Sequence, residues 1–323
     1  MKKDVFRFLV SLLSVGAMLF ILDRVGARVM WWVNQHTHDV SGPKIKMMTD
    51  SVDADFVMMG TSRCNSHYVP SILADSLRLT VYNGGVDASG CIFAHYFLLQ
   101  QLLRHHSPKM VGLDVLPNDY MVNPSSFNTM GFFAPYIGRS KEADEVFHEA
   151  GTYWYYQISH LYRYNSKSKA VSNLAGLLVN RQNHVDRGYL PGPPPPIFPD
   201  RLRTDVPDVL EVDSLKINYL EKFITQCQQR GILVFFVVSP SYTKVSPGLY
   251  DPLKDVAHRH GIPFFDYHTA RLFHDHPDYF RDHNHLWDRG ARLYSSRFAH
   301  DLKLWWERQN DANHSREDSV PTS

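Results

Sequence analysis

From residue 53 onward, short apolar runs alternate with longer amphipathic segments. Apolar residues recur at three- and four-residue spacing over residues 92–106 and 214–230, which predicts two helices, and Gly231 follows the second helix where a C-terminal cap belongs. The short apolar runs predict strands at residues 55–59, 79–82, 110–115, 232–238 and 263–266. This alternation predicts an α/β fold, and the wholly apolar run 232–238 is typical of a parallel strand covered on both faces.

Two segments depart from the alternation. Residues 120–213 are rich in Tyr, Asn and Ser and end in a proline run, so we expect a helical insertion followed by an extended loop. The proline run at 190–200 fits either a polyproline spacer or a lid or partner-docking segment. An apolar-periodic segment at 290–304 predicts a last helix, and the charged residues 307–323 predict a disordered tail.

The N-terminus carries an uncharged apolar run at residues 8–22, preceded by Lys2, Lys3 and Arg7. A membrane span needs about 20 residues, but a flanking arginine can snorkel to the membrane surface. We therefore expect an uncleaved anchor over residues 1–28, with a cleaved signal peptide and a soluble helix as alternatives. Basic residues before the run favour a single pass through the cytoplasmic (inner) membrane, with the body facing the periplasm or cell exterior.

Length and composition narrow the remaining possibilities. Residues 29–52 read as a polar connector, and residues 53–306 are enough for one large α/β domain. With 34 Lys plus Arg against 33 Asp plus Glu, the net charge of +1 gives no electrostatic case for binding nucleic acid. Cys64, Cys91 and Cys227 are too few and too scattered for a disulfide framework, and no CxxC pair indicates a structural zinc site.

The first candidate for chemistry is Ser62, in the run Gly60-Thr61-Ser62-Arg63 after the first predicted strand. A serine there lies at the carboxyl edge of a parallel sheet, where open α/β folds build their sites. Gly60 permits a tight turn, and a following helix would direct backbone N–H groups at a developing oxyanion. Serine after a strand is also a common helix cap, so this run alone leaves both interpretations open.

Asp282 and His285 are the second candidate. In a turn that leads into a helix, a three-residue offset lets the carboxylate reach one ring nitrogen and orient the imidazole, whose other nitrogen can deprotonate a serine. Taken alone, the segment is equally an ordinary polar loop. The neighbouring His274, His276 and His283 also suggest a metal site, although no further ligand at a recognisable spacing accompanies them.

The turns at residues 83–86 and 116–119 follow the second and third predicted strands. They bring Gly85 and Asn118 to the same edge of the sheet as Ser62. A glycine N–H and an asparagine side-chain amide, together with the Ser62 N–H, are suitable oxyanion donors, and each such donor supplies about 3 kcal/mol. Asn, Gly and Pro are also the usual residues of ordinary turns, which is the alternative interpretation.

Taken in order, these blocks resemble those of the SGNH, or GDSL-type, hydrolase superfamily over residues 55–304, with a gap at the insertion. The run at 280–295 is similar to the last block of membrane-anchored bacterial members, which accompany membrane-bound O-acyltransferases in modifying cell-envelope glycans. Two departures from the family pattern are Thr61 and Arg63 around the serine, where many members have Asp and Leu, and Leu116 in place of the third-block glycine. By motif, the resemblance places Ser62 on the nucleophile, Gly85 and Asn118 on the oxyanion positions, and Asp282 and His285 on the DxxH pair.

The resemblance implies a three-layer α/β/α domain of flavodoxin-like type with about five parallel strands. Ser62 would attack an acyl ester, His285 would take and return the proton, and Asp282 would hold the imidazole. No cofactor or metal is required. Discharge of the acyl group to water would make an esterase of acylated cell-envelope or extracellular glycans, and discharge to a sugar hydroxyl would make an O-acyltransferase. Arg63 would contact an anionic or polyhydroxylated substrate, or pair with a surface carboxylate.

Two rival functions follow from the same residues. One is a non-catalytic glycan-binding protein or scaffold partner of a membrane-bound O-acyltransferase, which the anchor and the proline-rich segment would suit equally well. The other is a metal-dependent hydrolase centred on the histidine cluster. A scaffold has no need of Ser62, Asp282 and His285 together, so their combination favours the serine enzyme.

Overall fold

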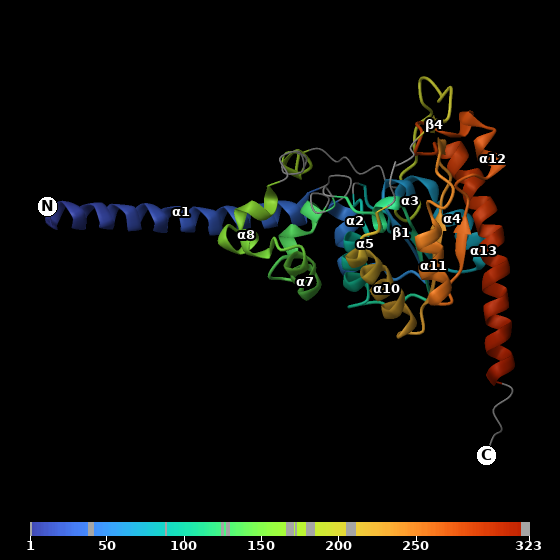
Figure 1. The fold of residues 1–323 in the computed structure, drawn as a ribbon, viewed down its shortest axis with the longest axis horizontal. Helices are drawn as coiled ribbons and strands as arrows, with labels where there is room; N and C mark the ends of the chain where they lie inside the picture. The colour runs from blue at the N-terminus through green and yellow to red at the C-terminus, as the bar shows by residue number, and fades with distance from the viewer. Residues whose placement is uncertain are drawn as a thin grey trace, which may run out of the picture. The chain divides into compact units, whose positions relative to one another are not determined.

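The computed structural model describes residues 2–37, 42–87, 89–123, 126, 130–165, 171, 173–178, 185–204 and 211–317. Its centre is a five-stranded sheet in which every neighbouring pair is parallel, in the order β2-β1-β3-β5-β7. Figure 1 shows the chain as a ribbon, with β1 of this sheet labelled. These strands are β1 (Phe56–Gly60), β2 (Val81–Asn83), β3 (Met110–Asp114), β5 (Leu233–Val238) and β7 (Phe264–Asp266). The predicted α/β class and the five parallel strands are confirmed.

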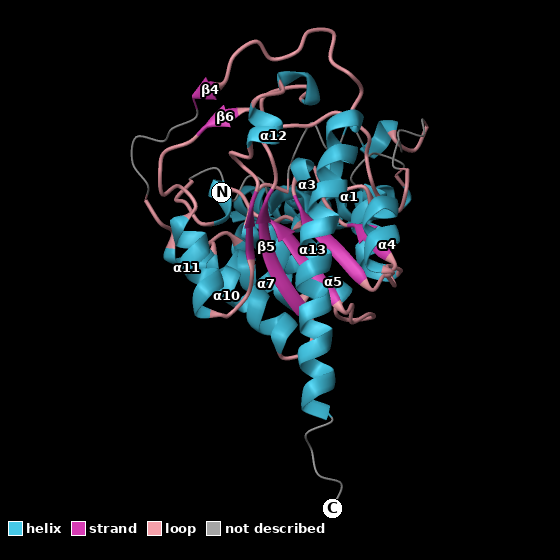
Figure 2. Cartoon of the chain, turned by 90° about the vertical axis from the view of Figure 1, so that its right-hand side faces the viewer, coloured by secondary structure: helices cyan, strands magenta, loops and turns pink. Residues whose placement is uncertain are grey.

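Helices cover both faces of this sheet. On one face, α5 (Ile92–Leu102) and α10 (Ser214–Gln228) pack together. On the other, α4 (Pro70–Leu77) and α13 (Asp288–Glu317) pack together, and α13 crosses in front of the strands in Figure 2. Alternate strand residues such as Phe56 and Met58 enter the core cluster that includes Phe298 of α13. The result is the expected three-layer arrangement.

Shorter elements connect these layers. Gly231 lies just after α10 and has a φ of +69°, the left-handed conformation that is common in a glycine after a helix. β4 (Arg203–Thr204) and β6 (Thr243–Lys244) form a second, two-stranded parallel sheet. The remaining elements of this part of the chain are α3 (Ser62–His67), η1 (Pro117–Asp119), α11 (Asp251–Arg259), α12 (Arg271–His274) and η5 (Pro277–Tyr279).

The chain divides into two compact units. One unit comprises Met1–Lys46 with Pro124–Gln182, and the other comprises Met47–Asn123 with Asn183–Ser323. Most of the predicted insertion therefore belongs with the N-terminal helix. The described helices of the first unit are α1 (Lys2–His36), η2 (Met130–Phe132), η3 (Ala134–Tyr136), α7 (Lys141–Glu149), α8 (Tyr153–Ile158) and η4 (Leu161–Tyr164), while α2 (Gly42–Asp50) crosses the boundary between the units.

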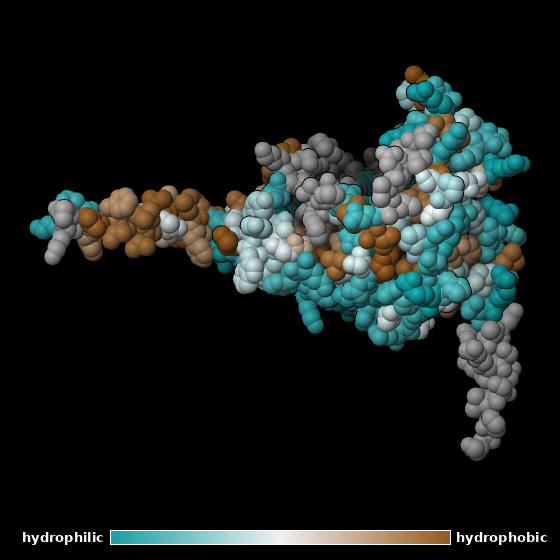
Figure 3. Space-filling model, viewed as in Figure 1, coloured by the Kyte–Doolittle hydropathy of each residue, from teal (hydrophilic) through white to brown (hydrophobic). Residues whose placement is uncertain are grey.

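Helix α1 is long and apolar enough over Lys3–His36 to cross a membrane, and its most apolar stretch is entirely unburied. Figure 3 shows hydrophobic side chains exposed along this helix. Helix also extends into the expected connector and the expected tail. The expected connector at 29–52 is largely helical, because α1 continues to His36 and α2 follows. The expected disordered tail is helical as far as Glu317, where α13 ends, and residues 318–323 lie outside the described part of the chain.

Candidate active site

The turn between β1 and α3 presents Ser62. Gly60 ends β1 with a φ of +150°, and a Cβ there would lie 2.7 Å from the Cβ of Cys64, so both conformation and space require glycine. Thr61 is the N-cap residue, and Ser62 is the first residue of α3. The backbone N–H groups of this first turn have no acceptor within the helix. The turn therefore places the Ser62 hydroxyl and helical amide donors at the carboxyl edge of the sheet.

Asp282 organises the loop that carries His285. Its carboxylate accepts the backbone N–H of Asn284 at 2.8 Å and of His285 at 3.0 Å. It also accepts from Nδ1 of the His285 ring, at 2.9 and 3.0 Å from its two oxygens. Burial by itself would raise the pKa of the Asp282 carboxyl. The hydrogen bonds from His285 and Asn284 and the charge of Arg281 outweigh burial and lower the pKa from 3.8 to about 2. An ionised Asp282 therefore fixes the tautomer in which Nδ1 of His285 carries the proton.

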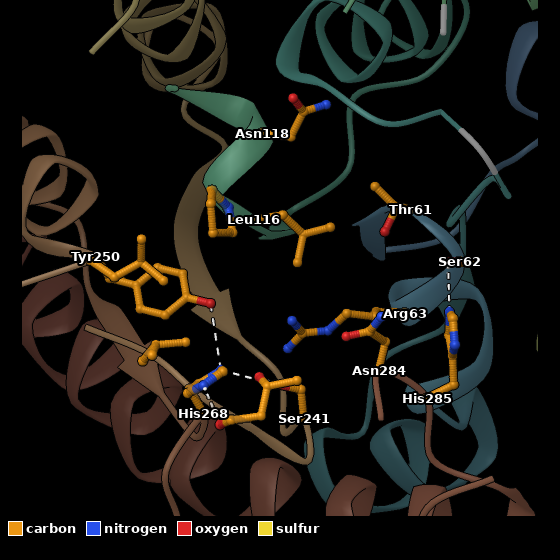
Figure 4. A pocket seen from close by; sticks show the side chains of 14 residues that line it. Thr61, Ser62, Arg63, Leu116, Asn118, Ser241, Tyr250, His268, Asn284 and His285 are labelled. Atoms are coloured by element: carbon orange, nitrogen blue, oxygen red, sulfur yellow. Dashed lines mark hydrogen bonds between the residues drawn. The ribbon is translucent and has the colours of Figure 1, made fainter. Parts of the chain in front are cut away.

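The structure brings Ser62, His285 and Asp282 together. Nε2 of His285 lies 2.8 Å from Oγ of Ser62, although the two residues are 223 positions apart in the chain. Since Nδ1 donates to Asp282, Nε2 is the acceptor of the Ser62 hydroxyl proton. Figure 4 shows this pair at one side of a cavity of about 560 Å³. The chemistry available to this arrangement is activation of a serine nucleophile by a histidine base.

A buried hydrogen-bond network links the two halves of the site. Nε2 of His67, on α3, accepts the backbone N–H of Leu286 at 2.9 Å. Its Nδ1 must then carry the proton and donates to Oγ of Ser239, 3.0 Å away. Ser239 in turn donates to Asp114 at 2.7 Å. The helix that begins at Ser62 is thus tied to the loop that carries His285 and to the ends of β3 and β5.

Burial keeps the His67 ring of this network uncharged. His67 is fully buried, and burial together with the positive charge of Arg63 holds the pKa of its ring well below 6.5. Burial also raises the pKa of Asp114, against the lowering effects of Arg63 and Ser239. Nε of Arg63 donates to Oγ of Ser239 at 3.1 Å, and Nη2 donates to the Ser239 carbonyl. Arg63 lines the cavity, but its guanidinium is held by Ser239 rather than by the surface carboxylate considered above.

The wall of the cavity opposite Ser62 includes His268, whose ring is uncharged. This ring is buried, and burial, Arg63 and His274 lower its pKa to about 3. Its Nε2 donates to the Thr243 carbonyl at 3.2 Å, so Nδ1 accepts from the Ser241 hydroxyl at 3.2 Å. Figure 4 shows this group facing the cavity. The wall opposite Ser62 is therefore polar, and its imidazole is held by the Ser241 hydroxyl and the Thr243 carbonyl.

The two predicted oxyanion residues have other partners in this structure. The N–H of Gly85 donates to Oδ1 of Asn83 at 3.0 Å, and Gly85 is not among the residues that line the cavity. A Cβ on Gly85 would lie 2.8 Å from the Cβ of Cys64, so the glycine permits close packing against α3. Asn118 does line the cavity, but its amide donates to the Gly90 carbonyl and points away from Ser62 in Figure 4.

The other three histidines of the sequence cluster have partners of their own, a backbone carbonyl for two of them and a carboxylate for the third. His274 donates from Nε2 to Ser241, and His283 donates from Nε2 to Arg201. His276 lies 3.6 Å from Asp278. Within the described ranges, no group of three or more His, Cys, Asp or Glu side chains is placed to hold a metal ion.

Sequence reasoning missed His67, Asp114, Ser239 and His268. Asp114 and Ser239 could have been found from their positions in the sequence, because Asp114 ends β3 and Ser239 directly follows β5. Polar residues at the carboxyl ends of adjacent parallel strands meet at one edge of the sheet. His67 lies one and a half helical turns after Ser62, on a helix too short to show a periodic pattern.

No family model and no curated protein matches this chain. Among solved structures, the chain is similar to a crystal structure of a Bacteroides fragilis protein provisionally described as an acylhydrolase, with 12% identity, a TM-score of 0.40, and coverage of 80% of this chain and 94% of that one. It is also similar to the acetyl xylan esterase AlAXEase, with 12% identity, a TM-score of 0.37, and coverage of 78% and 98% respectively.

Proposed function

We propose that this protein is a serine-dependent ester hydrolase or O-acyltransferase that uses Ser62, His285 and Asp282 as a catalytic triad. The observation that carries the proposal is the continuous hydrogen-bonded chain at the cavity wall. Oγ of Ser62 lies 2.8 Å from Nε2 of His285, and Nδ1 of the same ring lies 2.9 Å from Asp282. These are the distances that proton transfer from a serine to a histidine base requires.

The reaction proceeds in two transfers. Oγ of Ser62 attacks the acyl carbonyl while its proton moves to Nε2 of His285, and the protonated ring then gives that proton to the departing alcohol oxygen. The resulting acyl-Ser62 ester is attacked by water, which makes a hydrolase, or by a sugar hydroxyl, which makes an acyltransferase. His285 takes the proton from this second nucleophile and returns it to Ser62. The scheme uses no cofactor.

Donors for the tetrahedral oxyanion come from two places in this proposal. One is the first turn of α3, whose N–H groups lack intrahelical acceptors. The other is Asn118, whose side-chain amide lies at the cavity and would exchange the Gly90 carbonyl for the oxyanion when substrate binds. Gly85 contributes by letting its turn approach α3 closely. Arg63 and the polar wall around His268 would contact the remainder of the substrate.

We propose an acylated cell-envelope or extracellular glycan as the substrate. Hydroxyl and imidazole groups on the cavity wall suit a polyhydroxylated ligand. The length and apolar character of helix α1 support a single-pass anchor. We place this anchor in the cytoplasmic membrane with the body outside, where a membrane-bound O-acyltransferase would act as a partner. A non-catalytic glycan-binding or scaffold role is the alternative, and the labelling experiment described next separates it from catalysis.

The test is covalent labelling of the full-length chain in detergent with a fluorophosphonate probe, which reacts with activated serines. We expect labelling of the wild type and its loss in Ser62→Ala and in His285→Ala. His283→Ala is the matched control, since this half-buried ring lies in the same loop but donates to the Arg201 carbonyl. Absence of labelling in folded wild-type protein, or labelling that survives Ser62→Ala, would overturn the proposal and leave the binding role.

A further inference from the structure

The first unit contains a second cavity, of about 530 Å³, between α1 and the segment that follows η3. It is independent of the Ser62 site and of the chemistry proposed there. Its lining is amphipathic, with four arginines, one histidine, an aromatic and a small residue of α1, and no carboxylate. The lining residues are Phe20, Arg24, Ala27, Arg28, Gly138, Arg139, Gln157, His160, Arg163 and Tyr164.

The positive charge of this cavity is only partly neutralised. Asp23 pairs with Arg24, but it is committed to the backbone as well, because its carboxylate accepts the N–H groups of His160 at 2.9 Å and Leu161 at 3.0 Å. Those bonds attach the start of η4 to α1. Arg28 and Arg139 are both exposed at the cavity. Asp144 is a second carboxylate nearby, since it accepts the Gly138 N–H at 2.7 Å and its charge acts on Arg163. Among the described residues, these two carboxylates thus stand near the four guanidinium groups that line the cavity.

Arg163 and Arg139 are held in fixed positions. Arg163 is buried and donates to the Tyr156 carbonyl at 3.0 Å and to the Ile137 carbonyl at 2.6 Å. Arg139 lies over the ring of Trp31, with its guanidinium carbon 4.1 Å from the ring centre. Burial and the charges of Arg163 and Arg24 lower the pKa of His160, as expected where cations are concentrated. A preorganised group of guanidiniums is the usual protein device for binding phosphate.

The surroundings of the cavity indicate where the phosphate comes from. Arg24 lies two residues after the apolar stretch of α1, whose last residues, Phe20, Ile21 and Leu22, are all exposed. In Figure 1, α8 lies beside α1, and its Trp154 and Ile158 are also exposed. Arginine and aromatic residues at the end of a membrane-spanning helix lie at the level of the lipid headgroups.

We propose that this cavity binds the phosphate headgroup of an anionic membrane phospholipid. The arginines hold the phosphate, and Phe20, at the apolar end of the lining, contacts the start of the acyl chains. A zwitterionic lipid is disfavoured, because its ammonium group would enter the same positive field. Lipid binding also gives a role to Arg24 and Arg28. Both follow the apolar stretch, on the side proposed to face away from the cytoplasm, where arginines do not favour the proposed orientation of the span.

The test measures lipid retention by the full-length chain in detergent micelles, using native mass spectrometry during titration with phosphatidylglycerol or phosphatidylcholine. We expect wild-type protein to retain phosphatidylglycerol preferentially. Arg28→Gln combined with Arg139→Gln should weaken that retention about 30-fold, the effect of removing two cations close to an anionic headgroup. Arg230→Gln combined with Arg308→Gln is the matched control, since both arginines are exposed in the other unit, and it should retain lipid as the wild type does.

Arg28→Glu serves as a second variant, because Arg139 also stacks on Trp31 and its loss could disturb folding. Circular dichroism establishes that each variant is folded. Equal retention of the two lipids by wild-type protein would overturn the proposal, as would undiminished binding by Arg28→Glu. Inorganic phosphate is titrated in lipid-free micelles as a separate arm. Binding of inorganic phosphate as tightly as phosphatidylglycerol would assign the cavity to a free anion and overturn the lipid assignment.

Discussion

Replacing His67 by leucine tests how the active-site loop is held. The side chain is fully buried and accepts the Leu286 N–H at 2.9 Å, immediately after His285. Leucine fills a similar volume but cannot accept a hydrogen bond, so the buried N–H of Leu286 loses its partner. Leaving such a donor unpaired costs about 1–3 kcal/mol. We expect the free energy of unfolding at pH 7 to fall by that amount.

The pH dependence of this loss has a definite sign. The His67 ring is neutral in the folded chain, since burial and Arg63 hold its pKa well below 6.5, whereas the unfolded chain takes up a proton below that value. His67 therefore lowers the stability of the wild type as pH falls below 6.5. Between pH 6.5 and 5 this amounts to about 2 kcal/mol. The deficit of His67→Leu should shrink or reverse at pH 5.

Thermal unfolding of the full-length chain in detergent, followed by circular dichroism at pH 7 and pH 5, measures both effects. For a domain of this size, 1 kcal/mol corresponds to a shift in Tm of about 2–4 °C. Fluorophosphonate labelling should also be slower in His67→Leu, because His285 loses the anchor of its loop. His67→Gln, which offers both an acceptor and a donor, should recover part of the labelling rate. A stability deficit that is absent at pH 7, or equal at both pH values, would refute this account of His67.

Asp282→Asn should flatten the acid limb of the stability profile. Burial opposes ionisation of Asp282, but hydrogen bonds lower its pKa from 3.8 to about 2. The ionised carboxylate therefore stabilises the fold fully above about pH 4, and this stabilisation is lost as pH falls towards 2. Thermal unfolding from pH 5 to pH 2 measures the loss. Asn118→Ala should lower the rate of acylation about 10²–10³-fold if its amide exchanges Gly90 for the oxyanion, as measured by pre-steady-state kinetics with an activated ester. Gly112→Ala should reduce the free energy of unfolding by about 1–3 kcal/mol, because the new Cβ would lie 2.6 Å from Sδ of Met58, and denaturant titration measures the change.

Each of these variants has a control in the same chain. Asp278→Asn removes an exposed carboxylate that pairs with Arg289, and it should leave the acid limb unchanged. Asn123→Ala removes a donor to the Asn118 side chain but keeps the Asn118 amide itself, so it should slow acylation far less than Asn118→Ala. Gly16→Ala adds a Cβ with no atom within 4 Å and should not alter stability. An unaltered acid limb in Asp282→Asn, a loss below tenfold in Asn118→Ala, or wild-type stability in Gly112→Ala would contradict the contact behind that prediction.

The sheet was predictable from the sequence because its strands are short apolar runs bounded by turn residues. The run 232–238 shows why, since a parallel strand buried on both faces needs an apolar side chain at every position, and β5 occupies Leu233–Val238. The contact between Asp282 and His285 was also predictable, because it depends only on a three-residue offset within one turn. Local chemistry of this kind is encoded by neighbouring residues.

Boundaries that depend on tertiary packing were not predictable. Residues 29–36 were expected to belong to the connector, yet α1 continues through them, and Val33 is buried within its own unit. The sequence likewise favoured one domain, whereas the chain folds residues 124–182 with its N-terminal helix. Neither result can be inferred from a local pattern, since each depends on which distant segment covers the helix.

The sequence alone therefore determined the fold class, the order of the strands along the chain and the residue types available for catalysis. Tertiary structure decided which of them meet. Ser62 reaches His285 across 223 positions, and His67 reaches Ser239 across 172, because parallel register brings the ends of β1, β3 and β5 to one edge of the sheet. The same folding directs the donors of Gly85 and Asn118 to other partners. A motif specifies which groups are present, but the direction in which a side chain points depends on the packing of segments that lie far apart in the sequence.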